Sequence, residues 1–512
     1  MKKPHVVVFP CAVQGHINPL MEFAKRLVCR NLMVTFVTTE KVKERMAQAQ
    51  DGAASANSAL QNIRIETISD GLTPDLDRKK STDTEIDLLK KFGSVSFEHL
   101  IERLNAQGQR VSCIVYDSFL DWVPLIAKKF VIPVAFFWTQ SCAVYSIYYH
   151  YRKRSGLPYS LTAYYLLLPP PVYIDHQRNE EDESGNDMNV KVISGLPELH
   201  LSDLPSFLQS SNPYPSILRL ALDQFNIISQ ATWILGNSFT ELEVAEIKSM
   251  ESFIRIRTVG PLVPSSFLEG NNLKDIDVGA HLWKTTNCMS WLNTKGESTV
   301  IYVSFGSLAV LSKEQIHEIA FGLKASGHSF LWVIRPSDSE EENDTTENLP
   351  EGFLEETSGK GLVVSWCPQM MVLSHSSIAL FMTHCGWNSM LESLSLGVPM
   401  LAFPQWSDQP TNAKYIEQHW KIGIKLNKRE NGLVGRKEVC KLIKEVMETK
   451  QGVKLRKNAL WWKTLAMKSM KNGGSSEKNI EAFVEEVRNS ASLMPFTSYD
   501  IDNISLNLLS SV

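Results

Sequence analysis

Residues 378–397, IALFMTHCGWNSMLESLSLG, place an apolar run, a short polar turn and a helical pattern one after another. The run 378–384 has the length and composition of a buried strand, and apolar residues then recur at three- and four-residue steps. Gly386 allows a tight turn between them, and Asn388 or Ser389 can cap the helix. The stretch therefore predicts a strand that leads into a helix N-terminus, where backbone N–H groups favour an anion such as phosphate.

The same alternation of strand and helix patterns runs through both halves of the 512-residue chain. Buried runs rich in β-branched residues and separated by helices are typical of parallel sheets covered on both faces. The predicted strands lie at 5–10, 33–39, 63–69, 112–118 and 133–139, and then at 300–306, 330–336, 361–366, 378–384 and 398–404. We predict an α/β protein of two Rossmann-like, doubly wound domains that face a central cleft, with ligands at the carboxyl ends of the strands.

The domain boundaries follow from composition. We predict an N-terminal domain at 1–250 and a C-terminal domain at 286–472. The linker at 251–285 contains the Pro-, Gly- and Ser-rich stretch RTVGPLVPSSFLEGNN. Residues 473–490 are predicted to form a helix that packs back on the N-terminal domain, and 491–512 to be a loose tail.

Composition excludes several classes of protein. A formal net charge of -4 gives no electrostatic footprint for nucleic acid or an anionic membrane. The eight cysteines include no C-x-x-C pair, so neither a zinc site nor a disulfide framework is predicted. No run is long and apolar enough to span a bilayer, and Pro4, His5 and Pro10 interrupt the N-terminal stretch that weakly imitates a signal peptide. We expect free thiols in a reducing, cytoplasmic compartment, with no nucleic-acid partner and no membrane insertion.

The turn at 384–393 has structural interpretations as well. His384 and Cys385 stand side by side, but no further ligand lies nearby in sequence, so we predict no metal site. Ser389 and Glu392 have the spacing of a capping box, which would give Glu392 a purely structural role. The stretch 304–307, SFGS, follows another predicted strand and is a weaker indication of a second phosphate loop.

Residues 366–409 resemble the 44-residue signature box of plant family-1 UDP-dependent glycosyltransferases. The W-x-P-Q start, the H-C-G-W-N-S centre, the following Glu and the D-Q end all stand at matching spacing. Further matching stretches are GHINP, YDS, GPLVP and SFGS. This resemblance covers all but about the last 20 residues. It implies the GT-B fold, with an acceptor-binding N-terminal domain and a UDP-sugar-binding C-terminal domain.

The resemblance also implies the donor-binding residues. Trp366 would stack on the uracil, while Gln369 and Glu392 would contact the ribose, whose hydroxyls suit a carboxylate acceptor. His384, Asn388 and Ser389 would hold the diphosphate at the helix N-terminus, with Ser304 contributing from the other loop. The donor-binding residues implied in this way are Ser304, Trp366, Cys367, Gln369, His384, Gly386, Trp387, Asn388, Ser389, Glu392, Asp408 and Gln409.

The sugar is expected to contact Trp387, Asp408 and Gln409. In the family a final Gln, here Gln409, usually accompanies UDP-glucose, and Trp387 stands where users of glucuronate often carry Arg. UDP-glucose is therefore the expected donor, and no cofactor is expected.

The catalytic pair is implied by the resemblance. A lone His at a helix start, such as His16, is more often a cap or a surface residue, and Asp117 at a strand end can simply cap a turn. In the family the first is the base and the second fixes its tautomer and stabilises its protonated form. The expected reaction is deprotonation of an acceptor hydroxyl, in-line attack on the anomeric carbon and inversion to a β-glucoside.

The acceptor is less well specified. We predict that Cys11, Gln14, Gly15, Phe137, Trp138 and Gln140 lie at its pocket, although core packing is the alternative for the aromatic residues. Similar proteins act on phenolics, carboxylic acids, terpenoids or steroids, so the product is a β-glucoside or a glucose ester. The alternatives are the same fold and mechanism with another UDP-sugar donor, or a non-catalytic sugar-nucleotide binder. A monomer is the expected oligomeric state. A nicotinamide or flavin oxidoreductase is disfavoured because no G-x-G-x-x-G opens a helix.

Overall fold

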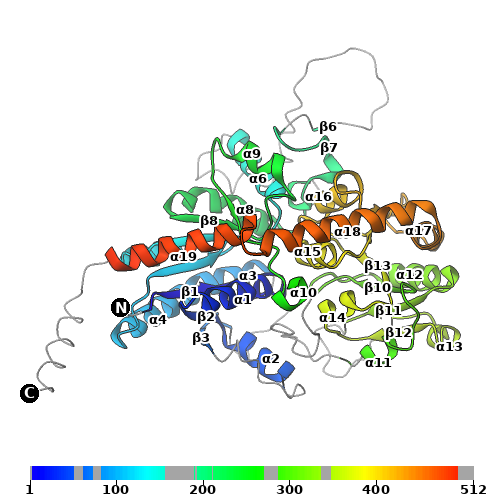
Figure 1. The fold of residues 1–512 in the computed structure, drawn as a ribbon, viewed down its shortest axis with the longest axis horizontal. Helices are drawn as coiled ribbons and strands as arrows, with labels where there is room; N and C mark the ends of the chain where they lie inside the picture. Colours follow the sequence, from blue (N-terminus) through cyan, green and yellow to red (C-terminus); the bar gives the residue numbers. More distant parts are fainter. Residues whose placement is uncertain are drawn as a thin grey trace, which may run out of the picture.

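The computed structural model describes residues 3–50, 62–72, 82–155, 189–190, 193–209, 212–269, 286, 288–335 and 348–493. Two parallel sheets, one in each half of the chain, lie side by side along the long axis of the molecule (Figure 1). The first has seven strands in the order β3-β2-β1-β4-β5-β8-β9. Their bounds are β1 His5–Phe9, β2 Met33–Thr39, β3 Ile63–Ile68, β4 Cys113–Asp117, β5 Val134–Trp138, β8 Trp233–Gly236 and β9 Arg257–Thr258.

The second sheet has six parallel strands in the order β12-β11-β10-β13-β14-β15. Their bounds are β10 Val300–Ser304, β11 Ser329–Val333, β12 Gly361–Val364, β13 Ile378–Thr383, β14 Met400–Ala402 and β15 Gly423–Lys425. A small antiparallel pair joins β6 Asn189–Val190 to β7 Leu199–His200.

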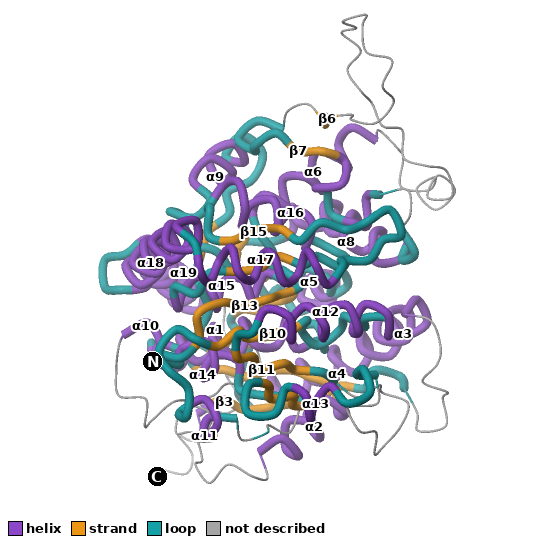
Figure 2. Tube along the Cα trace, turned by 90° about the vertical axis from the view of Figure 1, so that its right-hand side faces the viewer, coloured by secondary structure: helices purple, strands orange, loops and turns teal. Residues whose placement is uncertain are grey.

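Helices cover both sheets, because each strand is followed by a crossover that returns the chain to the sheet (Figure 2). Those of the N-terminal domain are α1 Gln14–Cys29, α2 Glu40–Gln50, α3 Thr82–Leu88, α4 Ser94–Ala106, α5 Val123–Lys129, α6 Cys142–Ser155, α8 Pro215–Ile227, α9 Val244–Met250 and α10 Ser265–Glu269. The remainder are α11 Met289–Leu292, α12 Lys313–Ser326, α13 Phe353–Glu356, α14 Gln369–Ser374, α15 Trp387–Leu396, α16 Gln409–Lys414, α17 Arg436–Glu448, α18 Lys450–Met470 and α19 Ser475–Leu493.

Each sheet reverses its strand order at one point. In the first sheet β2 and β3 lie on one side of β1, whereas β4, β5 and β8 lie on the other. In the second sheet β11 and β12 lie on one side of β10, whereas β13, β14 and β15 lie on the other. The carboxyl ends of β1 and β4 lead to His16 and Asp117, and those of β10 and β13 lead to Ser304 and His384. Crevices at such reversal points bind ligands in open α/β sheets, so the fold brings all four residues to expected binding positions.

The predicted linker at 251–285 is wrong at its start. β9 lies within that range and pairs with β8, so the first sheet continues past residue 250. Residues 270–285 lie outside the described part of the chain.

The C-terminal helix α19 returns to the N-terminal domain (Figure 1). Phe483 is fully buried, with ring centroids 5.8 Å from Phe23 and 5.3 Å from Trp233. The Trp233 indole N–H donates to Glu486 at 2.5 Å, which ties the same helix to β8. α19 continues to Leu493, so the tail predicted for 491–512 begins later than expected, and its remainder lies outside the described residues.

Candidate active site

A cavity of about 1060 Å³ lies between the two domains and is lined by residues of both. Most of the residues predicted from the sequence lie on its wall. Those that line it are Cys11, Gln14, Gly15, His16, Gln140, Ser304, Trp366, Cys367, Gln369, His384, Gly386, Trp387, Asn388, Ser389, Glu392, Asp408 and Gln409. Strand ends that are nearly 400 residues apart in the sequence thus meet in one cavity.

His16 and Asp117 form a hydrogen-bonded pair at the N-terminal side of the cavity. His16 Nδ1 lies 2.7 Å from Asp117 Oδ2, and the His16 side chain is 16% exposed while that of Asp117 is fully buried. The other carboxylate oxygen of Asp117 accepts the backbone N–H of Phe119 at 3.0 Å. Since an ionised carboxylate can only accept, this geometry assigns the proton to Nδ1 and leaves the Nε2 lone pair for a reacting group.

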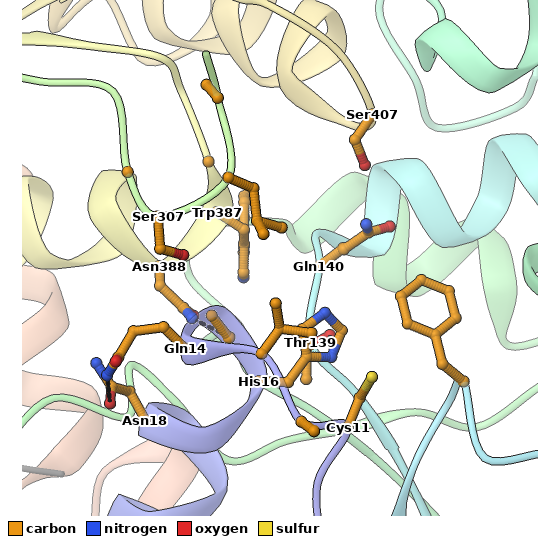
Figure 3. A pocket seen from close by; sticks show the side chains of 18 of the residues that line it. Cys11, Gln14, His16, Asn18, Thr139, Gln140, Ser307, Trp387, Asn388 and Ser407 are labelled. Carbon is orange, nitrogen blue, oxygen red and sulfur yellow. Dashed lines mark hydrogen bonds between the residues drawn. The ribbon is translucent and has the colours of Figure 1, made fainter. Parts of the chain in front are cut away.

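The environment of His16 suits a base. Burial lowers the pKa of this imidazole, but the charge and hydrogen bond of Asp117, with the charge of Asp408, outweigh that effect and raise it above its ordinary value. Thr139 Oγ1 lies 3.3 Å from His16 Nδ1, and the Phe119 ring packs with its centroid 5.2 Å from that of the imidazole. The ring is therefore held on three sides. In Figure 3 it lies beside Thr139 and across from Trp387.

The helix α15 begins differently from the sequence prediction. Gly386 is the N-cap residue, and no side chain caps this helix. Asn388 and Ser389, predicted as caps, lie inside the first turn. The left-handed residue of the turn is Cys385, with φ 68°, whereas Gly386 has φ -61°. Gly386, Trp387, Asn388 and Ser389 at this helix start line the cavity. The first N–H groups of an α-helix have no partner within the helix, so they are available to an anion such as phosphate.

Glycine at position 386 is required by close approach to His384. A Cβ on Gly386 would clash with Nε2 of His384, and one on Gly306 would lie 2.6 Å from the same atom. The imidazole therefore lies between two glycines, one from each loop that follows β10 and β13. Burial lowers the pKa of His384 to about 4, and a hydrogen bond from the imidazole to the backbone of Ser304 opposes the shift. At neutral pH His384 can act as a neutral hydrogen-bond donor but not as a cation.

The predicted ribose contacts form a connected network. Gln369 donates from Nε2 to Ser389 Oγ at 2.9 Å and to Glu392 Oε2 at 2.6 Å, and Tyr302 donates its hydroxyl to Gln369 Oε1 at 3.1 Å. The capping box predicted for Ser389 and Glu392 is therefore wrong, because Glu392 bonds across to α14. Burial raises the pKa of Glu392 to about 7, although the Gln369 amide opposes this. Trp366 lines the cavity beside this network.

The predicted sugar contacts are fixed by local hydrogen bonds. Gln409 Oε1 accepts the backbone N–H of Gln405 at 2.8 Å and that of Trp406 at 3.1 Å. Asp408 Oδ2 accepts Asn412 Nδ2 at 2.7 Å. Burial raises the pKa of Asp408 to about 6, against the effect of the Asn412 bond. Both side chains thus have one fixed orientation at the cavity wall.

Two of the predicted acceptor residues do not reach the cavity. Phe137 and Trp138 lie in β5, are 0% and 1% exposed, and pack into the two hydrophobic cores on opposite faces of the first sheet. The alternative of core packing is therefore correct for both. Thr139, Tyr302 and Gly306 also line the cavity but were not predicted to do so. All three belong to predicted strands, with Thr139 and Gly306 at the carboxyl ends, and that position was the available signal.

Comparison with known proteins agrees with this geometry. A family model described as "UDP-glucoronosyl and UDP-glucosyl transferase" matches residues 239–465. The chain is 39% identical over 483 residues to UDP-glycosyltransferase 74E1 of Arabidopsis thaliana, covering 94% of this chain and 98% of the relative. This protein belongs to the plant UDP-glycosyltransferases. Gallate 1-beta-glucosyltransferase 84A23 of Punica granatum is 37% identical over 490 residues, covering 94% of this chain and 90% of that one.

Solved structures of other glycosyltransferases share the whole fold. Os79 from O. sativa in complex with UDP superposes with a TM-score of 0.79 at 30% identity, covering 94% of this chain and all of that one. A UDP-glucosyltransferase from Polygonum tinctorium gives 0.74 at 28% identity, covering 95% and 99%. The enzyme therefore has the GT-B fold. Within the described residues, no group of three or more His, Cys, Asp or Glu side chains could hold a metal ion, and no helix there could cross a membrane.

Proposed function

We propose that this glycosyltransferase transfers glucose from UDP-glucose to a small lipophilic acceptor with inversion, giving a β-glucoside or a glucose ester. The observation that carries the proposal is the His16–Asp117 pair, joined at 2.7 Å, in the same cavity as the residues of the signature box. A non-catalytic sugar-nucleotide binder has no use for an oriented base at that position.

In the proposed mechanism His16 Nε2 takes the proton of the acceptor hydroxyl as that oxygen forms a bond to the anomeric carbon. The bond between this carbon and the UDP oxygen breaks on the opposite face, and UDP leaves with the electron pair. Asp117 stabilises the imidazolium, and the first turn of α15 stabilises the charge on the diphosphate. The proton on His16 then passes to solvent.

Charge at the donor side favours a neutral sugar. None of the described C-terminal-domain residues that line the cavity is Lys or Arg, whereas Glu392 and Asp408 are there. The carboxylate of a uronic acid placed near Asp408 would have no cation beside it, and an unpaired buried charge is costly. Glucose is therefore the proposed donor sugar.

Part of the acceptor side of the cavity is apolar. Phe119, Leu120, Trp122, Tyr214 and Ile217 line it. Such a wall suits a ring-bearing acceptor that presents one polar group to His16. Relatives of this chain are named for gallate and for mogroside, so aromatic acids and terpenoid alcohols belong in an acceptor panel beside phenols.

The test is UDP release from UDP-glucose, UDP-galactose and UDP-glucuronate with a panel of phenols, aromatic acids and terpenoid alcohols. We expect UDP-glucose to be preferred and the product to be β-linked by NMR. His16→Ala should lower turnover of hydroxyl acceptors by about 10² or more while UDP binding persists. Carboxylic acids, already ionised, should lose less. UDP binding without turnover on any acceptor would refute the proposal and favour a non-catalytic binder.

A further inference from the structure

The side chain of Asn388 joins the two domains. Its Nδ2 donates to the backbone oxygen of Gly15 in the first turn of α1, and its Oδ1 accepts Nδ2 of Asn237 at 3.1 Å. Figure 3 shows this side chain reaching from α15 to the start of α1. Both ends of the amide are thus bonded to the N-terminal domain, although Asn388 belongs to the predicted phosphate site.

Pro19 explains why the oxygen of Gly15 is open to this bond. In an α-helix the carbonyl of residue 15 accepts the N–H of residue 19. Proline has no N–H, and its ring pushes that carbonyl away from the helix. α1 contains Pro19 beyond its first turn, so Gly15 lacks its normal α-helical donor. The amide of Asn388 supplies a hydrogen bond from the other domain.

Asn237 holds the opposite end of the link. It follows β8, is 1% exposed, and its Oδ1 accepts the backbone N–H of Leu262 at 3.0 Å. Its backbone oxygen also accepts the indole N–H of Trp387 at 2.6 Å. One residue of the N-terminal domain therefore contacts the first two residues of α15.

We infer that Asn237 and Pro19 are positioning residues, which set the first turn of α1 against the first turn of α15. His16 directly follows Gly15, and the diphosphate site begins beside Asn388, so this chain of hydrogen bonds sets the distance from base to donor. The inference rests on the proposed role of His16. A misplacement of about 1 Å can cost about 10²-fold in rate, so these residues control turnover without touching substrate.

Asn237→Ala is the first test, with Asn479→Ala as the matched control. Asn479 also donates from its side chain to a backbone oxygen, that of Thr258 at 2.9 Å, but lies on α19 away from the cavity. We expect Asn237→Ala to lower kcat by about 10- to 100-fold. The Kd for UDP should change less than about 3-fold, and the midpoint of the pH profile should stay in place because Asp117 still contacts His16. The control should keep kcat.

Pro19→Ala is a second test, which still decides the inference if Asn237→Ala does not fold. Replacing a proline inside a helix should maintain or raise Tm. The restored N–H would draw the Gly15 oxygen back to the helix, and kcat should fall about 3- to 10-fold. A residue that is only structural would lose Tm and kcat together.

Hydrogen exchange separates this inference from the proposed function, since it needs no turnover. In the wild type and in Asn479→Ala, UDP should slow exchange of the amides at 14–20, whereas in Asn237→Ala it should not. Retained protection in Asn237→Ala, with kcat within twofold of the wild type, would overturn the inference. An inactive wild type that still shows this protection would overturn only the proposed function.

Discussion

Asp117→Asn is the substitution that most directly tests the proposed base. The new amide has almost the same shape, and its oxygen can still accept the N–H of Phe119, which now bonds to Asp117 at 3.0 Å. Its NH₂ group would face Nδ1 of His16 in place of an acceptor. The imidazole would then carry its proton on Nε2, where it cannot accept one from the acceptor hydroxyl.

The size of the effect follows from the 2.7 Å contact of Asp117 with His16. A hydrogen bond to a charged group contributes about 1.5–3 kcal/mol. Since 1.36 kcal/mol is a factor of ten in rate, loss of this bond alone costs roughly 10- to 150-fold in kcat. The wrong tautomer adds to this, so we expect a loss of about 10² or more with a hydroxyl acceptor.

The pH dependence of kcat/KM is a second, independent test of the role of Asp117. Asp117 raises the pKa of His16, and a base works only when deprotonated, so wild-type kcat/KM falls as the pH drops through that pKa. Removing the carboxylate lowers the pKa, which moves the acid limb to lower pH beneath a lower plateau.

The assay measures kcat/KM against pH with the best phenol and the best aromatic acid of the panel. Glu98→Gln is the control, because Glu98 pairs with Lys129 at the surface of the same domain. The reasoning is refuted if Asp117→Asn keeps at least half of the wild-type kcat with the phenol, or if the acid limb stays in place.

Three further predictions concern the donor site and the domain contact. Uridine should bind less tightly as the pH falls through about 7, where Glu392 takes up a proton, and Glu392→Gln should abolish this dependence in calorimetry. If uridine binding by Glu392→Gln still depends on pH, another group is responsible for that dependence. Gly386→Ala should weaken UDP binding about 10-fold, because the new Cβ displaces His384 from the diphosphate site. Unchanged affinity would argue against that role of His384. Phe483→Ala should lower the free energy of unfolding by about 3–5 kcal/mol in denaturant titrations, and a loss below about 1 kcal/mol would contradict the packing of α19.

The sheet strands were predictable because the hydrophobic signal is local. The run 300–306 became β10 and the run 378–384 became β13, each within two residues of its predicted end. β8, β9 and β15 were missed, because strands of four, two and three residues are too short to give a clear pattern. The position of His16 beside Asp117 was available only from the family resemblance, since nothing local relates residues 101 positions apart. The roles of these residues in catalysis stay predictions.

The acceptor pocket shows where local patterns mislead. Phe137 and Trp138 are aromatic and precede a loop, as pocket residues often do, yet each is directed into a core. β5 is covered by helices on both faces, so its side chains pack into cores on opposite sides of the sheet and not into the cavity. In this segment the residues that reach the cavity are those past the end of β5, Thr139 and Gln140. Gln140 was predicted as a pocket residue, whereas Thr139 was not.

The contacts of α15 show that central residues of the signature box also join the two domains. Its central residues match ligand-binding positions of the family, and the sequence alone offers no reason to assign them anything else. In the structure the indole N–H of Trp387 and the amide of Asn388 are bonded to Asn237 and Gly15, at separations of 150 to 373 residues. A motif read along one chain segment cannot reveal partners on another domain. Because the Asn388 side chain lines the donor site and also bonds to the helix that carries His16, a change at Asn388 should alter the donor affinity and the alignment of the base together.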